Sequence, residues 1–309
     1  MTPTEKGALL RKELLRKDGC DEQRCFDLIK DGADINFTLR KGLSPLALAA
    51  GYGKLSIVQE LIKNGASLEA ASWSGTTALK AAAIEGHENI VKTLVENGAD
   101  INAGMIPPLL YVISSDTSPA PNALRILLDN GADMHAKDSI GQTAIFHAAL
   151  SDNAEGVRLL CAYGANIEEK DNTGRTPLID ATSRNNEQAV HILLDHGANI
   201  NGADGGGRTP LMRAIFHNSE DAAYVLLARG ADFSTIKNDS GQTAEDYAHA
   251  HRQKISNTHY ADRIIQAMGQ EHIKRTTAAF QSAAEKGTPR PRKIHRKANP
   301  PATAKPKQP

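Results

Sequence analysis

The chain has 309 residues, of which 40% are hydrophobic, 23% charged and 4% aromatic, and its 36 Lys and Arg balance its 36 Asp and Glu. Eight of the basic residues and no acidic ones fall in residues 286–309, so the residues before them carry a net charge of about −8. No stretch reaches the roughly 18 apolar residues of a membrane span, the first residues lack the apolar run of a secretory signal, and three cysteines are too few for a disulfide framework. We therefore expect a soluble, cytoplasmic protein.

The first residues predict a pair of helices. Residues 4–16 place leucines at 9, 10, 14 and 15, which gives a helix one apolar side, and residues 21–30 form a second amphipathic segment. Neither segment shares the motif that follows. The end of a stack of repeats must present a polar outer face, so atypical sequence is expected there. We assign residues 1–37 to an N-terminal capping unit.

A fixed period of 33 residues runs through the rest of the chain. A Gly-Ala pair followed by Asp, Asn or Ser recurs at this interval, at Gly32, Gly65, Gly98, Gly131, Gly164, Gly197 and Gly230. Four residues before all but the first glycine of this series stand Leu61, Leu94, Leu127, Leu160, Leu193 and Leu226. Each leucine belongs to the apolar face of a helix that the glycine terminates, and a constant period of this size indicates stacked supersecondary units.

A second, shorter helix is predicted before each of these helices. Ser or Thr can cap its first turn, and Pro or Ala fits its first position. The five starts are Ser44-Pro45-Leu46, Thr77-Ala78-Leu79, Thr143-Ala144-Ile145, Thr176-Pro177-Leu178 and Thr209-Pro210-Leu211. Alanines follow three residues after each leucine or isoleucine and allow neighbouring helices to approach closely.

These motifs resemble the ankyrin repeat, in which a turn, Thr-Pro-Leu-x-x-Ala, a second helix and Gly-Ala-Asp follow one another. The resemblance covers about residues 20–268 and implies an all-α ankyrin-repeat solenoid with β-hairpin-like turns between units. We assign the repeats to residues 38–70, 71–103, 104–136, 137–169, 170–202 and 203–234. The resemblance further implies a non-catalytic, monomeric module that binds partner proteins, although the family binds many unrelated partners.

The repeat at residues 104–136 departs from the pattern. Its turn is shortened, whereas the link between its helices is lengthened by residues 114–122. If Leu109 is the equivalent of Leu46, three residues are lost from the turn and three are gained in the link. The change is either drift at a tolerant loop or a protrusion that a partner recognises.

The C-terminal part begins with residues 235–270, which we assign to a capping repeat with a last helix near residues 259–268. Residues 271–309 become polar and then rich in Pro and Lys, a composition that predicts disorder, with a frayed helix over residues 273–286 as the alternative for that stretch. The basic tail at 286–309 is either a solvated end, a segment that binds nucleic acid or an acidic surface, or a docking segment for a carrier or for the acidic body. Nucleic acid is the less favoured partner, because the body is acidic and no aromatic residues interrupt the basic run.

No pattern in the sequence predicts chemistry. Cys25 and Cys161 occupy apolar helix positions, which assigns them to the core. Three histidines lie near the C-terminus without Cys, Asp or Glu at ligand spacing: His249, His251 and His259. No nucleophile stands at a spacing that pairs it with a base. We therefore predict no catalytic residues, no metal and no cofactor.

The resemblance implies that partners bind the concave side, where turn tips and first-helix ends repeat in register. The residues predicted to bind are Trp73, Ile140, Arg175 and Arg208 at the tips, and Tyr52, Leu150, Arg184, Phe216 and His217 at the helix ends. Trp and Arg are enriched among interface hot spots. We expect an aromatic anchor of Tyr52 and Trp73, although the tryptophan could instead fold over its own turn.

Three function classes stay open at this point. The favoured one is a scaffold, adaptor or inhibitor that binds a partner protein. An effector exported from a bacterium into a host cell, where it binds host proteins, is compatible with the lack of a cleavable signal. An enzyme would need domain-sized sequence outside the repeats, which the chain does not contain.

Overall fold

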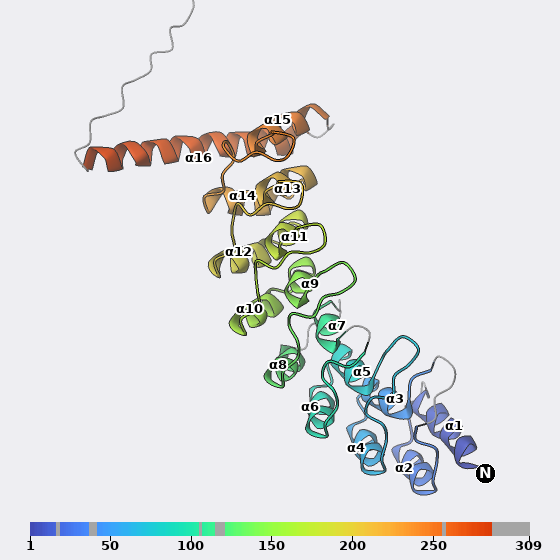
Figure 1. Ribbon diagram of the computed structural model, residues 1–309. Helices are drawn as coiled ribbons and strands as arrows, with labels where there is room; N and C mark the ends of the chain where they lie inside the picture. Colours follow the sequence, from blue (N-terminus) through green and yellow to red (C-terminus); the bar gives the residue numbers. More distant parts are fainter. Residues whose placement is uncertain (17–18, 37–41, 105–106, 115–120, 255–257, 286–309) are drawn as a thin grey trace, which may run out of the picture.

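The computed structural model describes residues 1–16, 19–36, 42–104, 107–114, 121–254 and 258–285. Within these ranges the chain forms sixteen α-helices and no strand, so the predicted all-α fold is confirmed. The helices stack in pairs from one end of the molecule to the other (Figure 1). One row holds the first helix of each pair, and the other row holds the second.

The N-terminal pair consists of α1 (Pro3–Leu14) and α2 (Glu22–Lys30), close to the positions expected from the sequence. Thr2 and Glu5 form a capping box at the start of α1: the Thr2 hydroxyl accepts from the Glu5 amide at 3.2 Å, and the Glu5 carboxylate accepts from the Thr2 amide at 2.8 Å. Leu10 and Leu14 are buried on the side of α1 that contacts the next repeat.

The first helices of the six repeats are short. They are α3 (Pro45–Gly51), α5 (Ala78–Ile84), α7 (Pro108–Ser114), α9 (Ala144–Leu150), α11 (Pro177–Ser183) and α13 (Pro210–His217). Hydroxyl groups of Ser44, Thr77, Thr176 and Thr209 accept the amide three residues on, as the sequence predicts for N-caps. The Thr143 side chain makes no such bond at the start of α9.

The second helices bury the periodic leucines. They are α4 (Leu55–Lys63), α6 (Glu88–Glu96), α8 (Pro121–Asp129), α10 (Ala154–Ala162), α12 (Glu187–Asp195) and α14 (Glu220–Ala228). All six predicted leucines, from Leu61 to Leu226, are 0% exposed. Because each helix pair contacts the pairs before and after it, the core runs the length of the stack.

The turns between repeats project as hairpin tips, and neighbouring tips are joined through their backbones. Within one tip, the Asp171 amide donates to the Arg175 carbonyl at 3.0 Å. Between tips, the Asn172 amide donates to the Ile140 carbonyl, and the Gly205 amide donates to the Thr173 carbonyl, both at 3.0 Å. The stack curves, and the tips and first helices lie on its inner side (Figure 1).

The irregular repeat keeps its place in the stack. Helix α7 begins at Pro108, and Leu109 is 0% exposed, as expected if it replaces Leu46 and Leu79, which are each 1% exposed. The shortened turn therefore still presents the right apolar residue to the core. The lengthened link at residues 115–120 lies outside the described residues.

The C-terminal end differs from the sequence-based boundary. After α15 (Ala244–Lys254), helix α16 runs without a break from Thr258 to Glu285. The boundary predicted at residue 270 therefore lies inside a helix, and residues 271–285 are helical. Residues 286–309, the predicted basic tail, lie outside the described part of the chain.

Specific contacts hold α16 against the preceding repeat. The Tyr260 hydroxyl donates to the Ala214 carbonyl at 3.1 Å. The Arg275 guanidinium donates to the carbonyls of Leu227 and Ala231, each at 3.2 Å, and lies over the Phe233 ring. The Leu227 carbonyl lies in the last turn of α14, and Ala231 lies three residues after that helix. The contacts of Arg275 thus hold the C-terminal part of α16 against the stack, and the hydropathy of the sequence does not predict them.

Replacing Gly174 by Ala should destabilise the stack more than replacing Gly164 by Ala. Both glycines have positive φ, 74° and 84°, so both variants carry the backbone strain of about 1–2 kcal/mol. A Cβ at Gly174 would also lie 2.6 Å from the Gly205 backbone nitrogen, whereas a Cβ at Gly164 meets nothing within 4 Å. Urea unfolding measures both. Equal losses would mean that the tip-to-tip contact adds no stability.

Candidate protein-binding face

We define the concave face as the exposed side of the first helices together with the hairpin tips. Four large hydrophobic side chains lie exposed on it: Trp73 at 76%, Tyr52 at 54%, Ile140 at 53% and Phe216 at 50%. All four were predicted as binding residues. A rigid frame that keeps bulky apolar side chains in water at repeated positions is typical of a binding surface.

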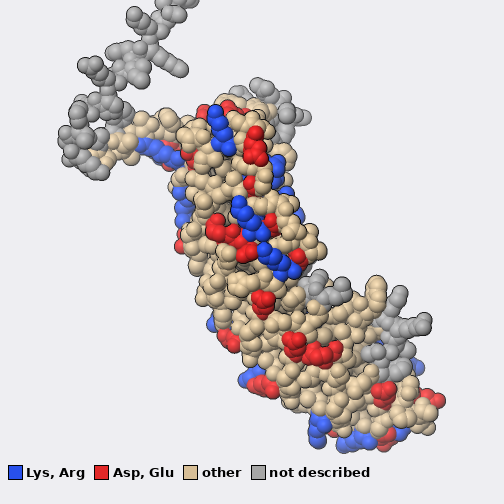
Figure 2. All heavy atoms as spheres, viewed as in Figure 1, with Lys and Arg blue, Asp and Glu red and all other residues tan. Residues whose placement is uncertain are grey.

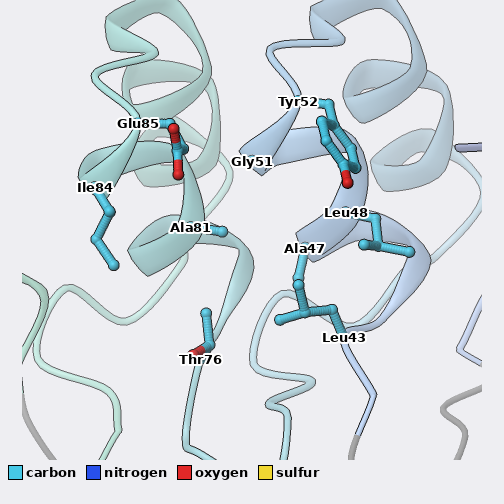
Figure 3. A pocket seen from close by; sticks show the side chains of 9 residues that line it. All are labelled: Leu43, Ala47, Leu48, Gly51, Tyr52, Thr76, Ala81, Ile84 and Glu85. Carbon is cyan, nitrogen blue, oxygen red and sulfur yellow. The ribbon is translucent and has the colours of Figure 1, made fainter. Parts of the chain in front are cut away.

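The N-terminal half of this face contains an apolar cavity of about 250 Å³ between α3 and α5. Tyr52 at the end of α3 and Ile84 at the end of α5 flank it, and Leu43 and Thr76 come from the turns before the two helices (Figure 3). Glu85 is the only ionisable side chain of its lining besides the Tyr52 phenol. The cavity can therefore accept an apolar side chain from a partner.

Trp73 is not among the residues that line the Tyr52 cavity, although Thr76 of the same turn is. It occupies the tip of the turn closed by the bond from the Ser72 amide to the Thr76 carbonyl, at 3.0 Å. Its 76% exposure is too high for a ring folded down over its own turn. The common patch expected for Tyr52 and Trp73 stays a prediction, because the two do not share one cavity.

The C-terminal half contains a larger cavity of about 640 Å³ over α9, α11 and α13. Six of the nine predicted residues line it: Ile140, Leu150, Arg175, Arg184, Phe216 and His217. The remaining lining residues are Gln142, Asp180, Ser183 and Arg213. Arg208 lies outside the lining but contacts the buried Asp204 carboxylate at 3.3 Å.

Three aspartates at equivalent positions lie below the surface of this half of the concave face. Asp138, Asp171 and Asp204 stand 33 residues apart, each at the base of a hairpin tip. The Oδ1 atom of Asp204 accepts the amides of Gly206 at 2.8 Å and Arg208 at 3.0 Å, which closes the turn. Its Oδ2 atom accepts the Arg213 Nε at 2.7 Å. In the first of these repeats, Asp138 Oδ2 lies 3.0 Å from His147 Nε2.

The middle repeat lacks a basic residue at the position that pairs with the tip aspartate in its neighbours. Nine residues after Asp171 stands Asp180, a carboxylate at the position that His147 and Arg213 occupy in the neighbouring repeats. The Asp180 carboxylate accepts from Gln142 Nε2 at 2.9 Å and lies 3.4 Å from Arg175 Nη1. The buried Gln142 and the partly exposed Arg175 thus meet at the same carboxylate.

The two buried carboxylates have opposite pKa shifts. Burial raises the pKa of Asp180, and the attraction of Arg175 does not offset it. Burial also acts to raise the pKa of Asp204, but hydrogen bonds from the Arg208 backbone and the Arg213 guanidinium outweigh burial and leave the pKa below its usual value.

Asp180, Asp204 and Arg213 were not among the sequence predictions. The repeat period could have revealed them. Residues 138, 171 and 204 occupy one equivalent position of the repeat, and residues 147, 180 and 213 occupy another. The second position corresponds to Leu48 and Ala81 in the N-terminal repeats, which are buried and apolar. A charged residue at a position that is apolar elsewhere in the same stack indicates a local ion pair.

The field over the C-terminal cavity is positive. Burial lowers the pKa of His217, and the charges of Arg213, Arg175, Arg184 and Arg208 lower it further. Figure 2 shows basic and acidic side chains gathered over α11 and α13, whereas the surface over α3, α5 and α7 is mostly uncharged. The two halves of the concave face thus differ in chemistry.

The described residues contain no group of three or more His, Cys, Asp or Glu side chains placed to hold a metal ion. Cys25 is fully buried, and burial raises its pKa to about 12, which makes it a core residue and a poor nucleophile. In the described part of the chain, no helix combines the length and apolarity that crossing a bilayer requires.

Comparison with known families follows this geometry. A family model described as ankyrin repeats (3 copies) matches residues 16–105, 109–204 and 185–237. The chain belongs to the ankyrin repeat family. Ankyrin repeat domains are generally non-catalytic modules that bind proteins. The predicted family is therefore confirmed, whereas the partner of this ankyrin stack is not identified by the match.

Solved ankyrin repeat structures resemble the chain over most of its length. The crystal structure of the ankyrin repeat domain of Bcl-3, a member of the IkappaB protein family, is 29% identical, with 74% of this chain and 99% of that chain covered and a TM-score of 0.63. The human ASB11 ankyrin repeat domain is 24% identical, with 74% and 97% covered and a TM-score of 0.62, and supports the fold alone. Comparison with curated proteins gives no match.

The opposite pKa shifts of Asp204 and Asp180 predict opposite pH dependences. The charge of Asp204 contributes stability above about pH 3.9, the unfolded pKa, and this contribution is lost as pH falls through the lowered folded pKa. Asp204→Asn should therefore lower the free energy of unfolding at pH 7 by about 3 kcal/mol, because Arg213 is left buried without its carboxylate. The loss should shrink below about pH 4.

Asp180→Asn is the matched control. Its raised folded pKa means that the proton on Asp180 stabilises the folded state below about pH 3.9, and this stability is lost as pH rises through the folded pKa. The wild-type protein should therefore lose stability relative to Asp180→Asn as pH rises. Urea unfolding between pH 3 and 7 measures both. The same pH trend in the two variants would contradict the assignment.

Proposed function

We propose that this ankyrin stack is a non-catalytic protein-binding module, a scaffold, adaptor or inhibitor, that holds its partner on the concave face. The observation that carries the proposal is the exposure of Tyr52, Trp73, Ile140 and Phe216 on that face. Such side chains are large enough to anchor a partner and lose little conformational entropy on binding.

The stack provides a rigid support for these residues. Tyr52 and Phe216 lie at first-helix ends whose preceding residues are buried, and Ile140 lies on a tip whose backbone is bonded to the next tip. Because the neighbouring repeats fix these positions, little reorganisation is needed on binding. Chemistry is not part of the proposal, because ankyrin repeat domains are generally non-catalytic modules.

The binding face can be tested by affinity capture from native cell lysate with single-residue variants. Tyr52→Ala, Trp73→Ala and Phe216→Ala should each weaken retention of the partner, by about 30-fold where the residue is a hot spot. Tyr224→Ala is the control, because Tyr224 is 37% exposed but lies on α14, in the second-helix row. Affinity of the purified partner is then measured by calorimetry.

A chain that ends at Glu285 separates the stack from residues 286–309. If the stack is the binding module, the shortened chain should retain the same partner with unchanged affinity. Retention that requires residues 286–309, or that Tyr224→Ala weakens as much as the concave-face variants do, would overturn the proposal. Loss of bound nucleic acid with rising salt in the full chain alone would assign binding to the basic tail.

A further inference from the structure

The C-terminal cavity holds more guanidinium groups than carboxylates. Arg175, Arg184 and Arg213 line it, and Asp180 is the only carboxylate that does so. The Arg213 guanidinium donates from its Nε to the buried Asp204 carboxylate at 2.7 Å. The charge that remains is that of Arg175 and Arg184, and Asp180, which lies 3.4 Å from Arg175 Nη1, offsets only part of it.

These two arginines have donors that the described residues do not satisfy. Arg175 approaches Asp180 through Nη1 at 3.4 Å, while its Nε is buried and has no hydrogen-bond acceptor. No described side chain forms an ion pair or hydrogen bond with the Arg184 guanidinium, which stands at the end of α11. Arg184 is exposed, so its guanidinium donors are open to a ligand that supplies acceptors.

Apolar side chains border the same cavity. Ile140 and Phe216 are about half exposed, and Leu150 is partly buried between them in the lining. The Phe216 ring meets His217 edge to face, with 5.1 Å between ring centroids. An occupant thus meets guanidinium groups and apolar surface within one cavity.

We infer that this cavity binds an extended peptide segment of the partner protein in which an Asp or Glu side chain lies beside a bulky apolar side chain. The carboxylate accepts hydrogen bonds from Arg184 and Arg175, and the apolar side chain packs on Phe216 and Ile140. This inference rests on the proposed function and adds the chemistry of the partner. The charge of Asp180 in the lining favours a monoanionic carboxylate over a phosphate, which carries up to two charges.

The test begins with a selection that assumes no partner. A phage library of random twelve-residue peptides is selected on the immobilised full-length chain, with bare matrix as the counter-selection. The selected sequences should be enriched in Asp or Glu adjacent to Leu, Ile, Phe or Trp. No enrichment over the matrix, or enrichment without acidic residues, would overturn the inference.

A double-mutant cycle then assigns the contact. A synthetic copy of one selected peptide and its Glu→Gln form are titrated against the wild-type chain and Arg184→Ala. Each single change should weaken binding at least about 10-fold, and the two together little more than one alone, because both remove the same charge-assisted bond. Additive losses would mean that Arg184 does not contact the carboxylate.

Arg158→Ala is the matched charge control, since Arg158 lies on α10 with 56% of its side chain exposed. It removes the same charge and should leave peptide affinity unchanged, and circular dichroism verifies the fold of both variants. Equal weakening by Arg158→Ala would reduce the effect to net charge and overturn the inference. A phosphoserine peptide that binds more tightly than its Glu form would overturn the choice of carboxylate.

Failure of this inference can be told apart from failure of the proposed function. Selected peptides that respond to Tyr52→Ala but not to Arg184→Ala would place binding in the N-terminal cavity, which overturns the inference and leaves the binding module intact. Partner capture that no concave-face variant weakens would instead overturn the proposed function itself.

Discussion

The structure depends on one constraint: a single short helix pair cannot bury its own apolar side, so each pair must pack on the next. The second helices, of nine residues each, direct fully buried leucines into the contact between neighbours. Every contact between neighbouring repeats spans about one period, and a change of length within a repeat is tolerated only if it preserves the contact. The irregular repeat satisfies this condition, because Leu109 occupies the core site despite its shortened turn.

The same constraint leaves the concave face free to vary. Its positions recur in register but carry little of the apolar core, so each repeat can place different chemistry there. The position filled by Leu48 and Ala81 in the N-terminal half holds Asp180 and Arg213 in the C-terminal half. Such buried charges require partners, and the tip aspartate Asp204 supplies one for Arg213. Hydrogen-bonded acidic and basic side chains therefore replace apolar contacts under the C-terminal cavity. Arg175 and Arg184 remain at the surface.

Much of the fold could be predicted from the sequence, because the glycines, N-caps and leucines repeat at a fixed interval. The predicted surface residues also followed from register: Ile140, Arg184 and Phe216 meet in one cavity although each comes from a different repeat. Register did not show which buried polar residues pair, since Asp204 accepts from Arg213 within its own repeat whereas Asp180 accepts from Gln142 of the preceding repeat. Nor did it show the length of α16, because Arg275 reaches carbonyls that lie more than forty residues earlier in the chain.

The division of the concave face also limits how a partner can use it. Four first-helix steps separate α3, whose C-cap residue is Tyr52, from α11, whose C-cap residue is Arg184, and packed helices lie about 8–10 Å apart. A single segment that contacts both Tyr52 and Arg184 must therefore span about 36 Å, or about eleven residues of extended chain at roughly 3.3 Å each. A shorter segment can use only one half, so its affinity depends on Tyr52 or on Arg184 but not on both. The stack thus offers two chemically distinct anchor points at a separation that its helix spacing fixes.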